Sequence, residues 1–143
     1  MCIRDSSVTA LRRELRAFRF DATQCPDLFP ALVALAAAAE GVTVIEGAGR
    51  LRSKECDRAD ALQEEYARLG IAIDLPDENR MLVRGGAIRP AEVWSHGDHR
   101  IAMSLAVAAL RCTGGSVTLR DAEVVSKSYP GFYEALDALR IQA

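Results

Sequence analysis

The chain has 143 residues, half of them apolar, with a formal net charge of −2 and a pI of about 5.7. A chain of this length can bury a core of its own, so one globular domain or two small repeated units are expected. The slight negative charge excludes a molecule-wide positive field for nucleic acid or anionic membranes, and any anion site must therefore be local.

Residues 1–7 fit no periodic pattern, and we interpret 1–14 as an irregular or foreign segment. The apolar and basic residues of 8–19 could form a short helix or a truncated element. Residues 1–7 have neither the apolar stretch nor the cleavage pattern of a secretion signal, so a cytoplasmic protein is expected. The cysteines are scattered without a Cys-x-x-Cys pair, which predicts free thiols rather than a zinc or redox site. They are Cys2, Cys25, Cys56 and Cys112.

Apolar spacing predicts a first helix over 28–40, because Leu28, Leu32 and Leu35 recur at helical intervals and Gly41 suits the end. Its apolar run is far shorter than the roughly 20 residues that a membrane span needs. The next predicted elements are a strand at 42–46, a helix at 54–69 and two strands at 71–75 and 80–84.

Much of this order recurs after a linker at 85–90. Val42-Thr43-Val44 corresponds to Val117-Thr118-Leu119, and Ser53-Lys54 to Ser126-Lys127, at offsets of 75 and 73 residues. The recurrence indicates two copies of one α/β unit that pack around a shared axis. The predicted elements of the second copy are a strand at 92–95, a helix at 98–111, a strand at 117–120 and a helix at 130–139.

Cations stand at the predicted helix starts, where they are normally depleted because the helix dipole places about half a positive charge there. The second helix opens with Lys54 and Arg58, the third with Arg100, and Lys127 closely precedes the fourth. A bound anion would offset the unfavourable placement, and exposed N–H groups of the helix starts would bind it as well. The pattern therefore indicates a phosphate or carboxylate site.

For each cation taken singly, the alternative is a solvated surface charge that is paired locally with Glu55, Asp57 or Asp98. The occurrence of such cations at three helix starts, in both copies of the unit, favours convergence on one anion. Arginine suits this role because its planar guanidinium pairs with phosphate and carboxylate groups in a bidentate manner.

Two carboxylates accompany the cations: Glu55 follows Lys54 directly, and Asp27 begins the first helix after Pro26. A carboxylate held among cations and substrate is a candidate general acid or base, since its surroundings can tune its pKa. The alternative is that Asp27 is a helix N-cap and Glu55 a favourable first-turn charge.

The two histidines, His96 and His99, lie three residues apart with Asp98 between them. A metal site is not favoured, because the sequence offers no third ligand at a suitable spacing. We expect His99 to have a supporting or packing role.

Four motifs resemble, in order and spacing, the C-terminal half of the EPSP synthase family. They are Asp21-Ala-Thr-Gln-Cys-Pro-Asp27, Arg50-Leu-Arg-Ser-Lys-Glu-Cys-Asp-Arg58, Asp98-His-Arg-Ile-Ala-Met103 and Ser126-Lys-Ser-Tyr-Pro130. The Lys-Glu-x-Asp-Arg and Asp-His-Arg-x-Ala-Met signatures together are highly specific for that family. The resemblance implies a mixed α/β (α+β) fold of repeated βαβαββ units, with about two units present over residues 15–143, a partial C-terminal domain.

The resemblance also implies roles for individual residues. By this likeness Asp27 accepts a proton and contacts shikimate 3-phosphate, which Lys54 also binds, and Glu55 takes part in proton transfer. The phosphoenolpyruvate-binding residues implied by the likeness are Arg58, Arg100 and Lys127. No metal or organic cofactor is implied, and the reaction belongs to chorismate and aromatic amino-acid biosynthesis by the shikimate pathway.

The family's N-terminal domain, which has phosphate-binding residues of its own, has no counterpart in this sequence. We therefore expect a fragment that is inactive alone, with no nucleic-acid or membrane partner, and a monomer when complete. Two alternatives are a non-catalytic anion-binding fragment and a relative of RNA 3'-phosphate cyclases, against which the acidic pI speaks.

Overall fold

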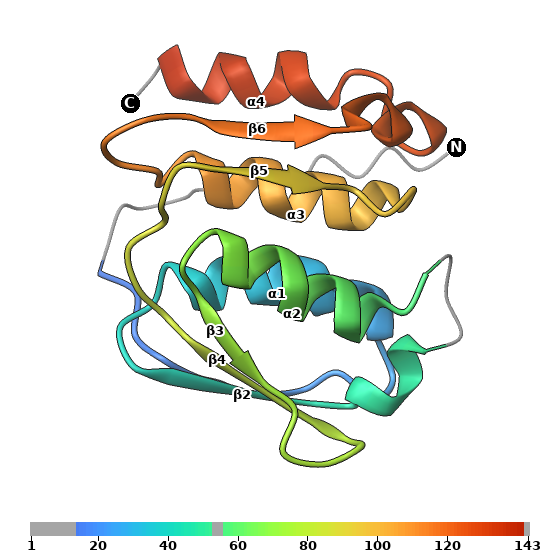
Figure 1. The fold of residues 1–143 in the computed structure, drawn as a ribbon. Helices are drawn as coiled ribbons and strands as arrows, with labels where there is room; N and C mark the ends of the chain where they lie inside the picture. The colour runs from blue at the N-terminus through green and yellow to red at the C-terminus, as the bar shows by residue number, and fades with distance from the viewer. Residues whose placement is uncertain (1–13, 53–55, 142–143) are drawn as a thin grey trace, which may run out of the picture.

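The computed structural model of the chain describes residues 14–52 and 56–141, and Figure 1 shows two α/β layers stacked on each other. The first layer contains β1 (Arg19–Asp21), η1 (Pro26–Leu28), α1 (Phe29–Ala37), β2 (Val42–Glu46), η2 (Ala48–Leu51), α2 (Arg58–Arg68), β3 (Ala72–Asp74) and β4 (Arg80–Arg84). The second contains β5 (Ala91–Trp94), α3 (His99–Ala109), β6 (Val117–Arg120), η3 (Ala122–Lys127) and α4 (Phe132–Ile141).

The first layer has the order strand, helix, strand, helix, strand, strand, which is the βαβαββ unit expected from the sequence. Its sheet has the strand order β1-β2-β4-β3, with β1 and β2 parallel and the other neighbours antiparallel. In the second layer β5 and β6 pair in parallel, with α3 between them in the chain. The second layer therefore repeats the first four elements of the unit, and the predicted mixed α/β fold is confirmed.

Three strands have the ranges predicted from the sequence: 42–46, 80–84 and 117–120. The predicted start of the second helix at Lys54 is wrong, because α2 begins at Arg58. The Asp57 carboxylate accepts hydrogen bonds from the N–H groups of Ala59 and Asp60 and so caps the helix there. Lys54 and Glu55 themselves lie outside the described residues.

Helices α1 and α2 cover one face of the four-stranded sheet, and α3 packs against them on the side away from the sheet (Figure 1). Alternate residues of the central strands, among them Ile45, Met81 and Val83, are fully buried under these helices. This alternation is typical of a sheet with one face in the core and the other in solvent. None of the helices in the described part of the chain is long and apolar enough to cross a membrane.

A chain of hydrogen bonds joins the three central helices inside the core. The Ser104 hydroxyl on α3 donates to the Pro30 carbonyl on α1 at 2.5 Å, and the Tyr66 hydroxyl on α2 lies 2.7 Å from Ser104 Oγ. Because Ser104 has one hydroxyl proton, Tyr66 donates to Ser104. Burial raises the pKa of the Tyr66 phenol. The phenol therefore keeps the proton that it donates to Ser104.

Candidate functional site

Arg58, the first residue of α2, is the largest fully buried side chain of the described residues, with a relative exposure of 1%. Burial of a guanidinium is unfavourable unless carboxylates pair with it. Its Nε donates to Asp98 Oδ2 at 2.6 Å and its NH1 donates to Asp27 Oδ1 at 2.8 Å. One arginine thus joins two carboxylates that come from different parts of the chain.

Asp98 has two functions at the start of α3. Its Oδ1 accepts hydrogen bonds from the N–H groups of Arg100, at 2.8 Å, and Ile101, so the side chain caps the helix. Its Oδ2 pairs with Arg58, and the side chain is fully buried. Sequence reasoning considered Asp98 only as a local partner of nearby cations. Its position at the start of a predicted helix could have indicated that Asp98 caps that helix. Its pairing with Arg58, 40 residues away, could not be predicted from the local sequence.

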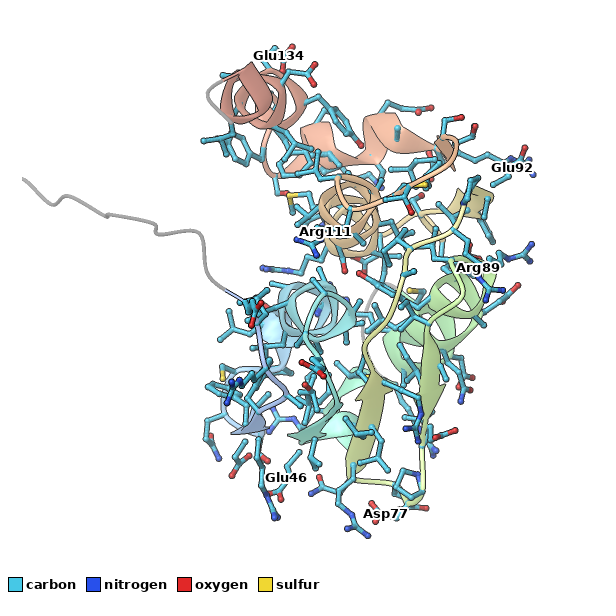
Figure 2. The ribbon with its side chains drawn as sticks, turned by 90° about the vertical axis from the view of Figure 1, so that its left-hand side faces the viewer. Glu46, Asp77, Arg89, Glu92, Arg111 and Glu134 are labelled. Atoms are coloured by element: carbon cyan, nitrogen blue, oxygen red, sulfur yellow. The ribbon has the colours of Figure 1, made fainter. Side chains whose placement is uncertain are left out.

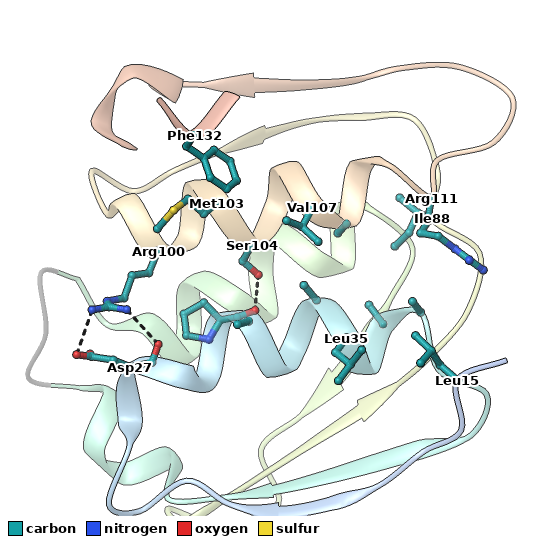
Figure 3. Close-up of a pocket in the computed structure, with 16 residues that line it drawn as sticks. Leu15, Asp27, Leu35, Ile88, Arg100, Met103, Ser104, Val107, Arg111 and Phe132 are labelled. Carbon is teal, nitrogen blue, oxygen red and sulfur yellow. Dashed lines mark hydrogen bonds and ion pairs between the residues drawn. The ribbon is translucent and has the colours of Figure 1, made fainter. Parts of the chain in front are cut away.

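Asp27 lies in η1 and joins the two arginines at the open edge of the cluster. Its Oδ2 is 3.3 Å from Arg100 NH2, and Arg100 NH1 also donates to the Asp27 carbonyl at 3.5 Å (Figure 3). The side chains of Asp27 and Arg100 are 48% and 36% exposed. The alternative that Asp27 is a simple N-cap is wrong, since Cys25 and Leu28 hold the cap positions of η1 and α1.

The structure brings together Asp27, Arg58 and Arg100, which come from η1, α2 and α3. Convergence of Arg58, Arg100 and Lys127 on one anion stays a prediction. The expectation that free helix-start N–H groups would add to the site needs correction. Asp57 and Asp98 already occupy two N–H groups at each of the starts of α2 and α3. An anion at this cluster would consequently depend on side-chain cations more than on the helix amides.

Lys127 is the last residue of η3, and its side chain is exposed. Segment η3 packs on α3 through Val124 and Val125, which form a small apolar cluster with Ala102. No ion pair joins Lys127 to another residue within 14–52 and 56–141. Its connection to the site thus depends on how η3 is held against α3.

A cavity of about 570 Å³ extends from the cluster along the groove between α1 and α3 (Figure 3). Asp27 and Arg100 lie at one end and Arg111 at the other, while Leu35 and Val107 are among the apolar residues between them. The charged groups of Asp27 and Arg100 are thus next to an apolar surface. Such a surface strengthens electrostatic interactions with any charged ligand beside it.

His96 does not combine with His99 as a metal pair. Its Nε2 lies 2.9 Å from Glu65 Oε1, and the side-chain ligand atoms of Glu64, Glu65 and His96 all lie within 4.8 Å of one another. The Arg68 guanidinium already pairs with both glutamates, donating to Glu64 Oε1 at 2.8 Å and lying 3.6 Å from Glu65 Oε2. That hydrogen bond holds the pKa of Glu64 below its usual value. A positive side chain thus stands where a cation would be needed.

The sequence matches the model of a known protein family. The sequence model of EPSP synthase (3-phosphoshikimate 1-carboxyvinyltransferase) matches residues 3–136, nearly the whole chain. The chain belongs to the EPSP synthase family. The resemblance seen in the four motifs is thereby confirmed.

Individual members of the family agree with this assignment. The 3-phosphoshikimate 1-carboxyvinyltransferase of Clostridioides difficile is 42% identical over 134 residues, covering 90% of this chain and 30% of the relative. The EPSP synthase structure from Acinetobacter baumannii aligns with a TM-score of 0.78 and 35% identity, over 87% of this chain and 30% of that one. The enolpyruvyl transferase NikO from Streptomyces tendae aligns with a TM-score of 0.67 and 28% identity, over 90% of this chain and 29% of its own.

The chain spans about 30% of the length of the curated EPSP synthases that it matches. The fold and the family follow from these comparisons. What the complete relatives bind and catalyse applies to this chain only as a proposal.

Proposed function

We propose that this chain is the C-terminal part of an EPSP synthase and contributes binding and proton-transfer groups for enolpyruvyl transfer. In that reaction the 5-hydroxyl of shikimate 3-phosphate attacks C2 of phosphoenolpyruvate while C3 accepts a proton. The resulting tetrahedral intermediate then loses phosphate. Proton transfer requires positioned carboxylates, and the phosphate and carboxylate groups of both substrates require fixed cations.

The proposed roles follow the four motifs. Arg58, Arg100 and Lys127 bind phosphoenolpyruvate, and Lys54 binds shikimate 3-phosphate. Asp27 accepts a proton and contacts shikimate 3-phosphate, while Glu55 takes part in proton transfer to or from the reacting atoms. No metal ion or organic cofactor is part of this scheme.

One observation supports the proposal above all others: Asp27, Arg58, Asp98 and Arg100 meet at one point although three helical segments supply them. A buried arginine network of this kind fixes the position of its exposed member, Arg100, before a ligand arrives. Preorganised charge is the main way in which a protein stabilises developing charge in a reaction. Asp27, being partly exposed beside Arg100, is accessible to a bound substrate.

A thermal scan of the purified chain tests binding without requiring turnover. Phosphoenolpyruvate at about 100 times its dissociation constant is expected to stabilise the fold by about 2.7 kcal/mol, which raises the melting temperature measurably. Arg100→Ala is expected to reduce this gain. Arg111→Ala is the matched control, since Arg111 lies at the far end of the same groove.

Ionic strength must be equal in all scans, because salt screens exposed charges and changes stability by itself. An equal gain for the parent, Arg100→Ala and Arg111→Ala would contradict the proposed site. Phosphate release from both substrates is the second measurement, and no turnover is expected, since catalysis needs binding groups from the remaining length of the relatives. Turnover near that of an intact enzyme would overturn the assignment of the chain as a partial enzyme.

A further inference from the structure

The carboxyl ends of β5 and β6 each continue into a segment that holds one of the proposed phosphoenolpyruvate-binding cations. The two strands are parallel with Trp94 opposite Arg120, so their ends lie side by side. Beyond β5 the chain turns through residues 95–98 into α3, whose second residue is Arg100. Beyond β6 it turns at Asp121 into η3, whose last residue is Lys127.

A hydrogen bond joins the two turns. Ser95 Oγ donates to Asp121 Oδ2 at 2.6 Å, and the Ser95 side chain is fully buried. The same oxygen accepts a hydrogen bond from Gly97 N at 3.1 Å, and the Ser95 carbonyl accepts one from Asp98 N at 3.0 Å. Ser95 therefore connects Asp121 directly with the residue that caps α3 and pairs with Arg58.

Both turns adopt a backbone conformation that side chains other than glycine rarely adopt. His96 has φ of +54° and Asp121 has φ of +56°. Such conformations are unfavourable and persist only where surrounding contacts enforce them. For His96 these contacts are the hydrogen-bond distance of 2.9 Å to Glu65 and the ring of Trp94, whose centroid lies 4.4 Å away. For Asp121 the contact is the hydrogen bond from Ser95.

We propose that Ser95 and Asp121 are positioning residues that hold the start of α3, with Arg100, and segment η3, with Lys127, in one fixed arrangement. This inference rests on the proposed function, because it concerns two of the cations assigned there to phosphoenolpyruvate. Neither Ser95 nor Asp121 contacts the ligand in this scheme. The hydrogen bond between Ser95 and Asp121 links the segment that carries Arg100 to the segment that carries Lys127. Among the described residues, no shared carboxylate pairs with both cations.

Hydrogen exchange of the chain without ligand tests the connection. Ser95→Ala removes the hydroxyl, so the amides of Arg100 and Ile101 are expected to exchange about tenfold faster. Because the link is mutual, the amides of Ser128 and Tyr129, which bond to the Val125 carbonyl at the end of η3, should exchange faster as well. Asp121→Gly, which accommodates positive φ without strain, should loosen the same two segments from the other side. Asp121→Asn keeps an acceptor oxygen and should restore most of the parental protection.

Glu92→Gln is the matched control. It removes the exposed ion pair between Glu92 and Arg120 across the same two strands, with a distance of 3.5 Å, and should change neither segment. If Ser95→Ala loosens only its own turn and leaves Ser128 and Tyr129 as protected as before, the inference is wrong. Loosening of both segments by Glu92→Gln as well would also overturn it, since any change in the strand pair would then have the same effect.

Calorimetric titration with phosphoenolpyruvate tests the positioning role. Ser95→Ala is expected to raise the dissociation constant about tenfold and Asp121→Asn to leave it within about twofold of the parent. An unchanged dissociation constant in Ser95→Ala, beside faster exchange, would refute the positioning role. If the parent itself binds no phosphoenolpyruvate, the proposed function and the positioning role both fail for this chain. The exchange measurement would still decide whether Ser95 joins the two turns.

Discussion

The Nε atom of Arg58 lies 2.6 Å from Oδ2 of Asp98, and both side chains are almost completely withdrawn from solvent. The pair joins the first residue of α2 to the cap of α3 across 40 residues of sequence. Removal of one charge from a buried pair leaves the other without compensation, which is strongly unfavourable. The stability of the fold and the geometry of the candidate site consequently depend on the same contact.

Asp98→Asn is expected to lower the free energy of unfolding by about 3 kcal/mol, because the amide keeps the cap and the shape but not the charge that Arg58 needs. The estimate is at the lower end for a broken buried pair, since Asp27 still contacts Arg58. Urea unfolding monitored by circular dichroism measures the difference. Asp57→Asn changes an equivalent helix cap without such a pair and should leave stability nearly unchanged. Equal losses in the two variants would refute a stabilising role for the buried pair.

Tyr66→Phe is expected to destabilise the chain by about 1 kcal/mol at neutral pH, through loss of the hydrogen bond to Ser104. Tyr129, which is 48% exposed, provides the control substitution Tyr129→Phe, with little expected effect. Denaturant midpoints at pH 7 distinguish the two. If both substitutions have the same effect, the hydrogen-bond chain between the three helices does not stabilise the core.

The stability of the parent and that of Tyr66→Phe should also depend differently on pH in the alkaline range. Burial raises the pKa of Tyr66 above its ordinary value of 10.0, so the folded state favours the protonated phenol. The stability that this group contributes is fully present below pH 10 and is lost as the pH rises above that value, where the unfolded chain ionises first. The parent should therefore lose stability more steeply than Tyr66→Phe above pH 10. Parallel pH profiles would contradict this interpretation.

Gly85→Ala is expected to cost about 3 kcal/mol, because a Cβ there would overlap the Ala39 carbonyl oxygen and lie 2.8 Å from the Ala36 carbonyl oxygen. These are backbone atoms at the end of α1, so the helix itself would have to move away from β4. Gly86→Ala is a control at the next position, where a Cβ meets only Ile71 Cδ1 at 3.7 Å. Melting temperatures of the two variants should differ clearly. Similar values would mean that α1 and β4 adjust more readily than their packing indicates.

Asp27→Asn should strengthen phosphate binding by about two- to fivefold, the equivalent of one exposed ion pair. Asp27 pairs with Arg100, so an incoming anion must compete with its carboxylate. Titration with inorganic phosphate at constant ionic strength measures the change. Asp77→Asn is the control for the lost negative charge, because Asp77 lies at the tip of the hairpin far from α3 (Figure 2). A similar gain in both variants would indicate net charge rather than competition at Arg100.

Regular elements with strong local patterns were predictable from the sequence. The β-branched run of β2, and the turn-forming residues 76–79 before β4, predicted the ranges that these two strands have in the structure. Strand β1 was not predicted, since it has only three residues and all of them are exposed. The start of α2 was placed four residues too early because the cations of the motif were taken as its first turn, whereas Asp57 is the cap.

The candidate site was predictable in its residue types but not in its pairing. The cations at helix starts indicated an anion site, and Asp27, Arg58 and Arg100 do meet. The deep burial of Arg58 was not foreseen, because partners 31 and 40 residues away in sequence leave no periodic signal. The hydrogen bond between Ser95 and Asp121 was missed for the same reason: it depends on the register of two parallel strands.

The distances in sequence between the members of the arginine cluster have a kinetic consequence. The carboxylate of Asp98 reaches Arg58 only after α2 and α3 have docked, and contacts of such long range form late because loop closure must precede them. Helix content should therefore recover during refolding before affinity for phosphate does. In a stopped-flow experiment, the delay between the two signals would give the time at which the two layers of the molecule come together.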